Sequence, residues 1–323
     1  MPHGHDDDHP NGQVPEDDSR SDASSDLEEL YPHEFPRYFV ERDGRLFHSH
    51  VSSPYPLPVD AYEQHRQNRQ HYLLRQVVEA NYANLVRHAL RNLPGEQRHV
   101  VDLCTGTGKW VMDLAADYPH ARIDGLDIVP IQTRHPLKNV FFEMHDVTER
   151  FRYGDRTIDF VHARDISYAV RTSDFPALIR EVARILRPGG LFMSGEWESD
   201  PIMSNGQHLD TAAPDTFVFF REVKNALRTC GLASAADGIP QWLRASGFRD
   251  LAIHQFRMTN DEQTGRRFVM IVTTYAESMQ LWLVKGGHLS HARARELVRG
   301  MLREVDSLPG IVFTYRVVHA RAI

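Results

Sequence analysis

A short apolar segment that runs directly into a glycine turn is the feature that most constrains the fold of this chain. Residues 100–103 read Val-Val-Asp-Leu, and residues 104–108 read Cys-Thr-Gly-Thr-Gly. Glycine in such a turn lets the backbone approach a ligand closely. Residues 109–117 then have the apolar spacing of a helix. A strand, a glycine turn and a helix in this order are typical of α/β folds that bind a ligand at the end of a strand.

Short apolar runs continue to alternate with amphipathic stretches after this turn. We expect strands at 98–103, 121–127, 139–144, 158–163 and 191–196 and helices at 109–117 and 175–186. This alternation predicts an α/β fold with a parallel, doubly wound sheet. Later in the chain we expect helices near 214–228, 238–246, 266–284 and 290–305 and strands at 249–256 and 311–319. We interpret the segments at about 200–247 and 258–308 as insertions that cap the open end of the sheet, where ligands bind.

The beginning of the chain differs sharply in composition from the remainder. Its first thirty residues hold ten acidic residues, one arginine and almost no large apolar side chain. Such a segment buries too little surface to offset the entropy of ordering. We expect residues 1–34 to form a disordered acidic tail, residues 35–97 an extended segment followed by helices, and residues 98–323 the main domain.

Charge, hydropathy and cysteine content exclude several classes of protein. The net charge of −7 arises in the acidic tail, so the rest of the chain is close to neutral and a dedicated nucleic-acid surface is not expected. No apolar run reaches the roughly 18 residues of a membrane helix, and the N-terminus lacks a secretory signal pattern. Cys104 and Cys230 are too few for a disulfide framework or a four-cysteine zinc site. We expect an intracellular protein, cytoplasmic or nuclear, without membrane association or a bound metal.

The spacing Asp-x-x-x-Gly-x-Gly from Asp102 to Gly108 resembles the first motif of class I methyltransferases. In that family the turn wraps the amino-acid portion and the ribose of the cofactor. The chain more closely resembles the fungal LaeA-type methyltransferases, which include a regulator of secondary metabolism and small-molecule methyltransferases. The stretches that carry this resemblance are residues 55–58 with 63–66 and His71, residues 102–110, residues 125–128 with the Pro-Ile-Gln tripeptide at 130–132, and residues 160–164.

The resemblance implies an α/β, Rossmann-like sheet of seven strands whose last strand is antiparallel, with N-terminal helices and helical cap insertions. It also implies S-adenosyl-L-methionine as the cofactor. Carboxylates at the ends of successive strands suit this neutral to cationic ligand better than a pyrophosphate. The cofactor-binding residues expected from the motif, from the following strand ends and from the early helix are Asp102, Cys104, Thr105, Gly106, Gly108, Trp110, Asp127, Ile128, Asp146, Val147, Arg164, Arg66 and Tyr62.

Individual roles follow for some of these residues. Asp127 is placed to accept hydrogen bonds from the ribose hydroxyls, with a helix cap as the alternative. Arg66 or Tyr62 is expected to close over the carboxylate of the cofactor. Arg164 could pair with Asp165, anchor the cap or hold a carboxylate on the acceptor, and of these we favour a structural role.

Cys104 stands where the family's first motif normally has glycine, and Thr105 follows it as a second departure. A side chain therefore occupies the turn. Because cysteine is small, we expect cofactor binding to persist with altered geometry. The alternative is an impaired cofactor site. We interpret the thiol as a small hydrophobic group rather than a redox centre.

Methyl transfer requires alignment of donor and acceptor more than a fixed set of catalytic residues. His162, at the end of the fourth expected strand, could take a proton from a hydroxyl or carboxyl acceptor. A packed, structural histidine is an equally supported interpretation. Glu196 and Trp197, at the end of the fifth strand, are expected to border the acceptor pocket, and we name His162 and Glu196 as the catalytic candidates.

Three functions remain open from the sequence. The first is methyl transfer to a small-molecule acceptor, a fungal secondary metabolite. The second is a nuclear regulator of secondary metabolism that acts through protein partners with weak or no methyltransferase activity. The third is a nicotinamide-dependent oxidoreductase, which we rank last because Gly108 is followed by Lys-Trp-Val instead of completing a Gly-x-Gly-x-x-Gly motif.

Overall fold

A computed structural model of the chain describes residues 27–260 and 265–323. The chain divides into two units, Met1–Leu30 and Tyr31–Ile323, and every element below belongs to the second unit. Most of the acidic tail expected over residues 1–34 lies outside the described residues. A 3-10 helix at Pro32–Tyr38 begins before residue 35, so regular structure starts earlier than the sequence suggests.

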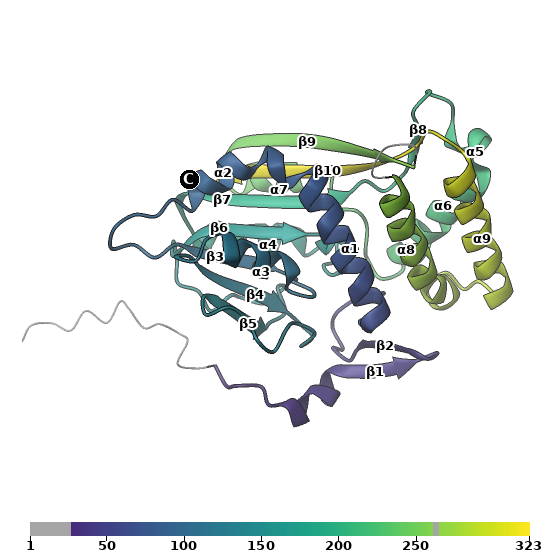
Figure 1. The fold of residues 1–323 in the computed structure, drawn as a ribbon. Helices are drawn as coiled ribbons and strands as arrows, with labels where there is room; N and C mark the ends of the chain where they lie inside the picture. Colours follow the sequence, from purple (N-terminus) through teal and green to yellow (C-terminus); the bar gives the residue numbers. More distant parts are fainter. Residues whose placement is uncertain (1–26, 261–264) are drawn as a thin grey trace, which may run out of the picture. The chain divides into compact units, whose positions relative to one another are not determined.

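One large sheet forms the centre of the second unit (Figure 1). Its principal strands are β3 (His99–Leu103), β4 (Arg122–Asp127), β5 (Val140–Met144), β6 (Ile158–Arg164), β7 (Leu186–Trp197), β9 (Arg249–Thr259) and β10 (Ile311–Arg321). The first five are parallel in the order β5-β4-β3-β6-β7. Strand β10 is antiparallel to β7 and to β9, and the two-residue strand β8 (Ile202–Met203) extends the β10 edge. The predicted seven-stranded sheet with an antiparallel last strand is confirmed, with β8 as an addition.

Helices cover both faces of this sheet because successive strand residues point to opposite sides. Val100 and its partner Phe160 pack with α1 (Ala61–Val77), α2 (Ala83–Ala89) and α3 (Lys109–Asp117). The neighbouring residues Val101 and Val161 belong to a second core beneath α4 (Phe175–Ile185) and α7 (Ile239–Ala245). The strand order changes direction at β3, because β4 and β5 lie on one side of it and β6 and β7 on the other. In open α/β sheets such a change of direction places a ligand crevice at the carboxyl ends of the strands.

The N-terminal segment forms a hairpin of β1 (Phe39–Arg42) and β2 (Arg45–His48), where the sequence analysis predicted only extended chain. Its turn is Asp43-Gly44, with positive φ at both residues, as a two-residue type I′ turn requires. Asp60 then caps α1 by accepting a hydrogen bond from the backbone N–H of Glu63 at 3.1 Å, which fixes the start of the helix.

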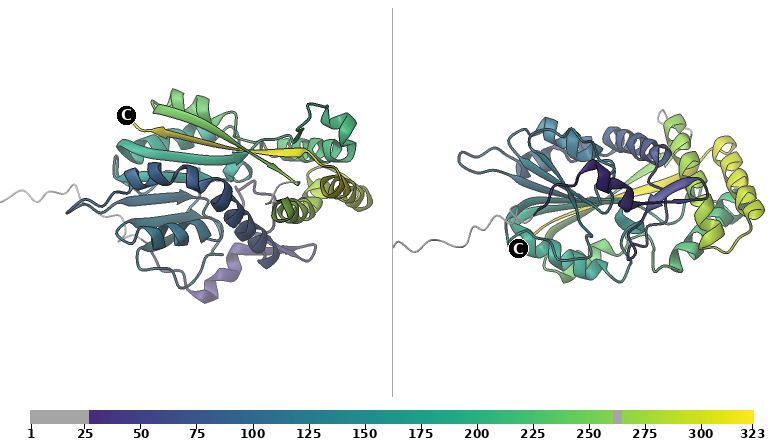
Figure 2. Two further views of the ribbon diagram at one scale, coloured as in Figure 1. Left: turned by 45° about the horizontal axis from the view of Figure 1, so that its top comes forward. Right: turned by 90° about the horizontal axis from the view of Figure 1, so that it is seen from below.

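Helices from the two expected insertions gather beyond the carboxyl ends of the strands (Figures 1 and 2). They are α5 (Leu209–Ala212), α6 (Pro214–Arg228), α8 (Gly265–Lys285) and α9 (His291–Ser307), and α8 packs against α1, α6 and α9. Helix α7 lies elsewhere, because the ring of Trp242 stacks on Phe175 of α4 with a centroid distance of 4.9 Å. The interpretation of residues 200–247 as one cap is therefore wrong for α7, which covers a sheet face.

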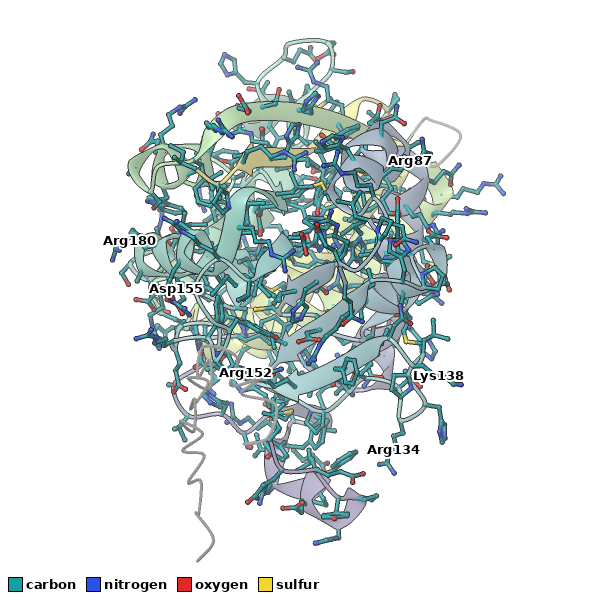
Figure 3. The ribbon with its side chains drawn as sticks, turned by 90° about the vertical axis from the view of Figure 1, so that its left-hand side faces the viewer. Arg87, Arg134, Lys138, Arg152, Asp155 and Arg180 are labelled. Carbon is teal, nitrogen blue, oxygen red and sulfur yellow. The ribbon has the colours of Figure 1, made fainter. Side chains whose placement is uncertain are left out.

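No helix in the described part of the chain is long and apolar enough to cross a membrane. The side of the molecule seen in Figure 3 carries labelled cations that lie well apart, among them Arg87, Lys138, Arg152 and Arg180.

Candidate functional site

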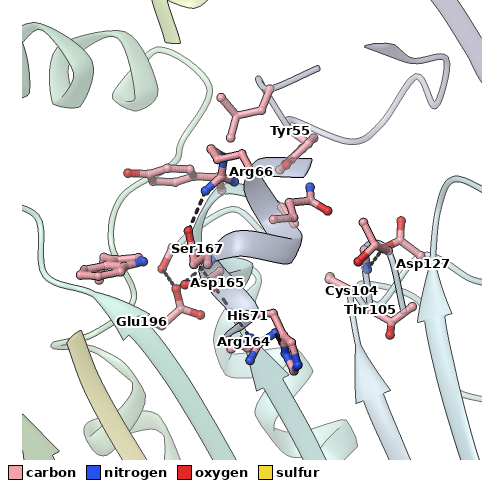
Figure 4. Close-up of a pocket in the computed structure, with 18 of the residues that line it drawn as sticks. Tyr55, Arg66, His71, Cys104, Thr105, Asp127, Arg164, Asp165, Ser167 and Glu196 are labelled. Carbon is pink, nitrogen blue, oxygen red and sulfur yellow. Dashed lines mark hydrogen bonds and ion pairs between the residues drawn. The ribbon is translucent and has the colours of Figure 1, made fainter. Parts of the chain in front are cut away.

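A cavity of about 230 Å³ opens where the carboxyl ends of the central strands meet helices α1 and α8. Its wall includes residues from the turn after β3, from the ends of β4, β6 and β7, and from both helices. In Figure 4, Cys104, Thr105 and Asp127 lie on one side of the cavity and Ser167 and Glu196 on the other. The cavity therefore has a glycine-turn side and a β7 side.

Left-handed backbone shapes the glycine turn. Cys104, Gly106 and Gly108 have φ values of 53°, 58° and 73°. A Cβ on Gly108 would lie 2.6 Å from the ring of Phe142, so only glycine fits there. Gly108 is not among the residues that line the cavity. Its contribution is to let the chain turn into α3.

Cys104 adopts a conformation that costs an L-residue other than glycine about 1–2 kcal/mol. Burial raises the pKa of its thiol well above the usual value. The thiol is therefore neutral near pH 7 and occupies the turn as a small apolar group. The side chain lines the cavity without closing it.

Asp102 holds two parts of the glycine-turn side in place. The hydroxyl of Thr105 donates to one carboxylate oxygen at 2.7 Å, and Nδ1 of His162 lies 2.7 Å from the other. The imidazole of His162 stacks on the ring of Trp110 at 3.7 Å. Burial lowers the pKa of His162, so the ring is neutral and donates from Nδ1. Nε2 is then the acceptor nitrogen of a histidine on the cavity wall.

Asp127 anchors the turn from the end of β4. Its carboxylate accepts from the backbone N–H groups of Gly106 at 2.7 Å, Ile128 at 2.8 Å and Val129 at 3.2 Å. Burial raises the pKa of Asp127 to about 6 despite these three donors. A carboxylate has about four acceptor positions, so Asp127 can accept a further hydrogen bond from a ligand hydroxyl.

These residues fit S-adenosylmethionine. Asp127 offers acceptor capacity for a ribose, and the end of β5 adds Asp146 and Val147 to the cavity wall. The strand-end carboxylates Asp102, Asp127 and Asp146 tolerate a sulfonium cation. Of the residues expected at the cofactor site, all but Gly108 and Tyr62 line this one cavity.

The raised pKa of Asp127 predicts that cofactor affinity depends on pH. A ribose hydroxyl donates to the ionised carboxylate, and protonation below about pH 6 removes that acceptor. We expect the Kd for S-adenosylhomocysteine to be constant above pH 7 and to rise toward about tenfold per unit below pH 6. Calorimetric titrations from pH 5 to 8 measure this change, and an Asp127→Asn variant should have a pH-independent Kd.

The raised pKa of Asp127 acts in the opposite direction on the stability of the unliganded protein, because that stability falls as the pH rises whereas the ligand affinity increases. Between the ordinary value of 3.8 and about 6, the folded chain holds a proton on Asp127 that the unfolded chain has released. The contribution of Asp127 to the free energy of unfolding therefore falls as the pH rises through this window.

The affinity measurements also have an outcome that would contradict the prediction. An affinity for S-adenosylhomocysteine that is unchanged from pH 8 to 5 would contradict the assignment of Asp127 to the ligand.

Arg66 and Tyr62 are not placed as the sequence suggested. Arg66 lines the cavity, but its Nε and Nη2 both contact Glu63 at 2.7 Å and its Nη1 donates to Gln70 at 2.6 Å. Tyr62 is 46% exposed and donates its hydroxyl proton to Glu277, away from the cavity. The expectation that Tyr62 closes over the cofactor is therefore wrong, and Arg66 is already neutralised.

Glu196 lies on the cavity wall at the end of β7, as expected. One oxygen accepts from the backbone N–H of Ile166 at 2.9 Å, and the other from the hydroxyl and N–H of Ser167 at 2.6 and 3.3 Å. Burial, and then the charge of Asp165, raise the pKa of Glu196. Both oxygens accept from residues of the loop after β6, which supports a positioning role for Glu196 in that loop.

The cavity also contains residues that sequence reasoning did not single out. Tyr168 and Tyr275 bring their hydroxyls within 3.1 Å of each other across the β7 side. His71 contacts Arg164 at 3.1 Å, and Gln70 donates to Asp165 at 2.6 Å. Of these residues, only His71 could have been found from the sequence, because it lies in a stretch that resembles the fungal methyltransferases. Across residues 27–260 and 265–323, no group of three or more His, Cys, Asp or Glu side chains could hold a metal ion.

Comparisons with known proteins agree with this geometry. Residues 69–303 match a family model described as "Methyltransferase domain". The secondary metabolism regulator laeA of Coprinopsis cinerea is 29% identical over 213 residues, which are 63% of this chain and 52% of that protein. Methyltransferase pytC of Aspergillus terreus is 29% identical over 222 residues, 67% of this chain and 64% of that protein. The chain thus spans between half and two thirds of the length of these relatives.

Among solved structures, geranyl diphosphate C-methyltransferase from Streptomyces coelicolor is similar to this chain with a TM-score of 0.44. The two are 14% identical in sequence. The similarity covers 86% of this chain and 92% of that chain.

Proposed function

This chain belongs to the methyltransferase domain family, and from that premise we propose that it transfers the methyl group of S-adenosyl-L-methionine to a small organic acceptor. The observation that carries the proposal is one continuous cavity with two kinds of wall. The glycine turn and Asp127 line one side. Aromatic and aliphatic side chains line the other.

The apolar side has the character of a pocket for an organic molecule. Its lining residues from β7, β10 and the cap helices are Trp197, Phe220, Phe268, Ile271, Val272 and Phe313. The rings of Phe268 and Phe313 lie 5.0 Å apart, and Phe268 lies 6.1 Å from Trp197. These rings form an apolar wall that favours an apolar acceptor over a flexible polar one.

The groups of the β7 side carry little net charge, which favours a neutral acceptor. Burial raises the pKa of Asp165 and of Glu196 on this side, and the nearby guanidinium of Arg66 is neutralised by Glu63. Tyr168 and Tyr275 add two hydroxyls that can bond an oxygen or nitrogen of the acceptor. A neutral, largely apolar molecule with a few polar atoms meets these conditions, as a fungal secondary metabolite would.

S-adenosylmethionine supplies an electrophilic methyl group, and the protein has to align the acceptor atom with it and exclude water. The apolar wall excludes water from the acceptor side. Nε2 of His162 is the acceptor nitrogen of a neutral imidazole, fixed by Asp102 and by stacking on Trp110. It can take the proton that a hydroxyl acceptor loses as its oxygen is methylated.

A second candidate is a regulator of secondary metabolism that acts through protein partners. Two observations favour it. Relatives are named as such regulators, and Cys104 strains the turn where the family's first motif normally has glycine. In that case the cavity would bind the cofactor weakly or without turnover.

Methyl-labelled S-adenosylmethionine distinguishes the two functions. The purified full chain is incubated with the label and a fungal metabolite extract, and radioactivity is counted in the organic-solvent and protein fractions. We expect label in the organic fraction. Label in protein alone, or none in either fraction although S-adenosylhomocysteine binds, would contradict a small-molecule acceptor.

A matched pair of variants on α8 locates the acceptor. Val272→Phe fills the apolar side of the cavity, whereas Met270→Phe adds the same ring at a position that is 46% exposed. We expect Val272→Phe to reduce transfer at least tenfold while S-adenosylhomocysteine affinity stays within twofold of the wild type. Met270→Phe should leave transfer unchanged. Equal transfer by the two variants would exclude this wall from the acceptor site.

A further inference from the structure

The three Arg and Lys side chains on the cavity wall differ in how their charge is balanced. Arg66 is paired with Glu63 at 2.7 Å. Lys109 is paired with Asp113. The nearest carboxylates to the guanidinium of Arg164, among the residues that the structure describes, are those of Asp165 and Glu79, each at 4.0 Å. Arg164 is thus the cation on the wall with the weakest charge pairing.

Arg164 is held by a neutral partner. Its Nη2 donates to Nδ1 of His71 at 3.1 Å, and Nε2 of His71 lies 3.0 Å from Asp113 (Figure 4 labels His71 and Arg164). Because Nε2 faces a carboxylate, it carries the proton and leaves Nδ1 as the acceptor. Burial, and then the charge of Arg164, lower the pKa of His71 to about 4. His71 therefore orients the guanidinium without neutralising it.

The sheet order places Arg164 opposite the ribose end of the cofactor site. Asp127 ends β4, Arg164 ends β6, and β3 with its glycine turn lies between them. Two strand spacings amount to about 10 Å. With the ribose at Asp127, a cofactor that crosses the glycine turn brings its amino-acid portion toward Arg164.

We propose that Arg164 binds the α-carboxylate of S-adenosylmethionine, and that His71, held by Asp113, is the positioning residue that aims it. A guanidinium forms paired hydrogen bonds with a carboxylate, and the weak pairing of Arg164 leaves its donors available. Arg164, at the end of β6 and held by His71 of α1, thus takes the carboxylate-binding role that the sequence suggested for Arg66 or Tyr62. The proposal concerns the cofactor alone, so it does not depend on the nature of the acceptor.

Two ligands separate this role from a general contribution to folding. S-adenosylhomocysteine contains the amino-acid portion, whereas 5′-methylthioadenosine lacks it and keeps the ribose and adenine. We expect Arg164→Gln to weaken S-adenosylhomocysteine binding by about 10–100-fold, the range of a lost hydrogen bond to a charged group. Its affinity for 5′-methylthioadenosine should stay within twofold. Calorimetric titration of the full chain with each ligand measures both values.

Variants of α1 test the positioning step. His71→Ala should weaken S-adenosylhomocysteine about tenfold and leave 5′-methylthioadenosine unchanged, while His71→Gln retains an acceptor for Arg164 and should recover part of the loss. Arg75→Gln is the matched control, because Arg75 lies on the same helix and donates to the same Asp113 at 2.6 Å but does not line the cavity.

Binding of 5′-methylthioadenosine at wild-type affinity also reports that a variant is folded. If Arg164→Gln does not fold, the His71→Ala and His71→Gln pair decides the question. Unchanged S-adenosylhomocysteine affinity in folded Arg164→Gln or His71→Ala would overturn the proposal. An equal loss of affinity for S-adenosylhomocysteine and 5′-methylthioadenosine would also overturn the proposal.

Discussion

Glu63→Ala is expected to lower the free energy of unfolding by about 3–5 kcal/mol, as removal of one partner from a buried ion pair does. Glu63 is 0% exposed and accepts from Nε of Arg66 and from the hydroxyl of Ser278, each at 2.7 Å. Without its carboxylate, the buried guanidinium of Arg66 has no ionic partner at that distance among residues 27–260 and 265–323. The contact between α1 and α8 through Ser278 is lost as well.

Chemical denaturation of the wild type and the variant measures this difference. Glu277→Ala is the matched control, because Glu277 also joins α8 to α1, through Tyr62, but on the exposed side. We expect that control to change the free energy of unfolding by less than about 0.5 kcal/mol. The double variant Glu63→Met with Arg66→Met should lose less stability than Glu63→Ala, since it buries no unpaired charge. A loss below about 1 kcal/mol in Glu63→Ala would show that the pair contributes little.

Asp127→Ala is expected to weaken S-adenosylhomocysteine binding by about 100-fold or more. The substitution removes the acceptor for a ribose hydroxyl and leaves the N–H groups of Gly106, Ile128 and Val129 without their carboxylate. Each hydrogen bond to a charged group contributes about 1.5–3 kcal/mol, so loss of one ligand contact together with disorder of the turn accounts for this effect.

Calorimetry with Asp127→Ala and Asp127→Asn resolves the two contributions. Asparagine keeps one oxygen for the N–H groups of Ile128 and Val129, so the second variant should bind with intermediate affinity. An affinity of Asp127→Ala within threefold of the wild type would mean that the ligand does not contact the end of β4.

Local pattern was sufficient to predict the central sheet. The strands near 98–103 and 158–163 and the helix at 109–117 appear within one residue of their expected bounds, because apolar periodicity reports burial directly. The hairpin at β1 and β2 was missed although Asp43-Gly44 is a strong turn signal. Strand β7 begins at Leu186, five residues before the expected start at 191, because Pro188 and the two glycines after it have low strand propensity.

The cofactor side of the cavity was predictable because its residues follow successive strands, and parallel strands end at one edge of the sheet. The remaining contacts join residues that are distant in sequence. Tyr168 meets Tyr275, and His71 meets Arg164, only after α1 and α8 have packed. Arg66 lost its expected role for a different reason, since its partner Glu63 is local, lies one helical turn away and satisfies its charge.

We propose that the cavity at the end of β3 binds S-adenosylmethionine despite Cys104. Calorimetric titration of the unmodified chain with S-adenosylmethionine, S-adenosylhomocysteine and, in parallel, reduced nicotinamide adenine dinucleotide tests this proposal. We predict that the first two ligands bind with micromolar Kd values, one molecule per chain. We predict no heat of binding for reduced nicotinamide adenine dinucleotide. Binding of the nicotinamide, or no binding of either sulfur-containing ligand, would contradict this account.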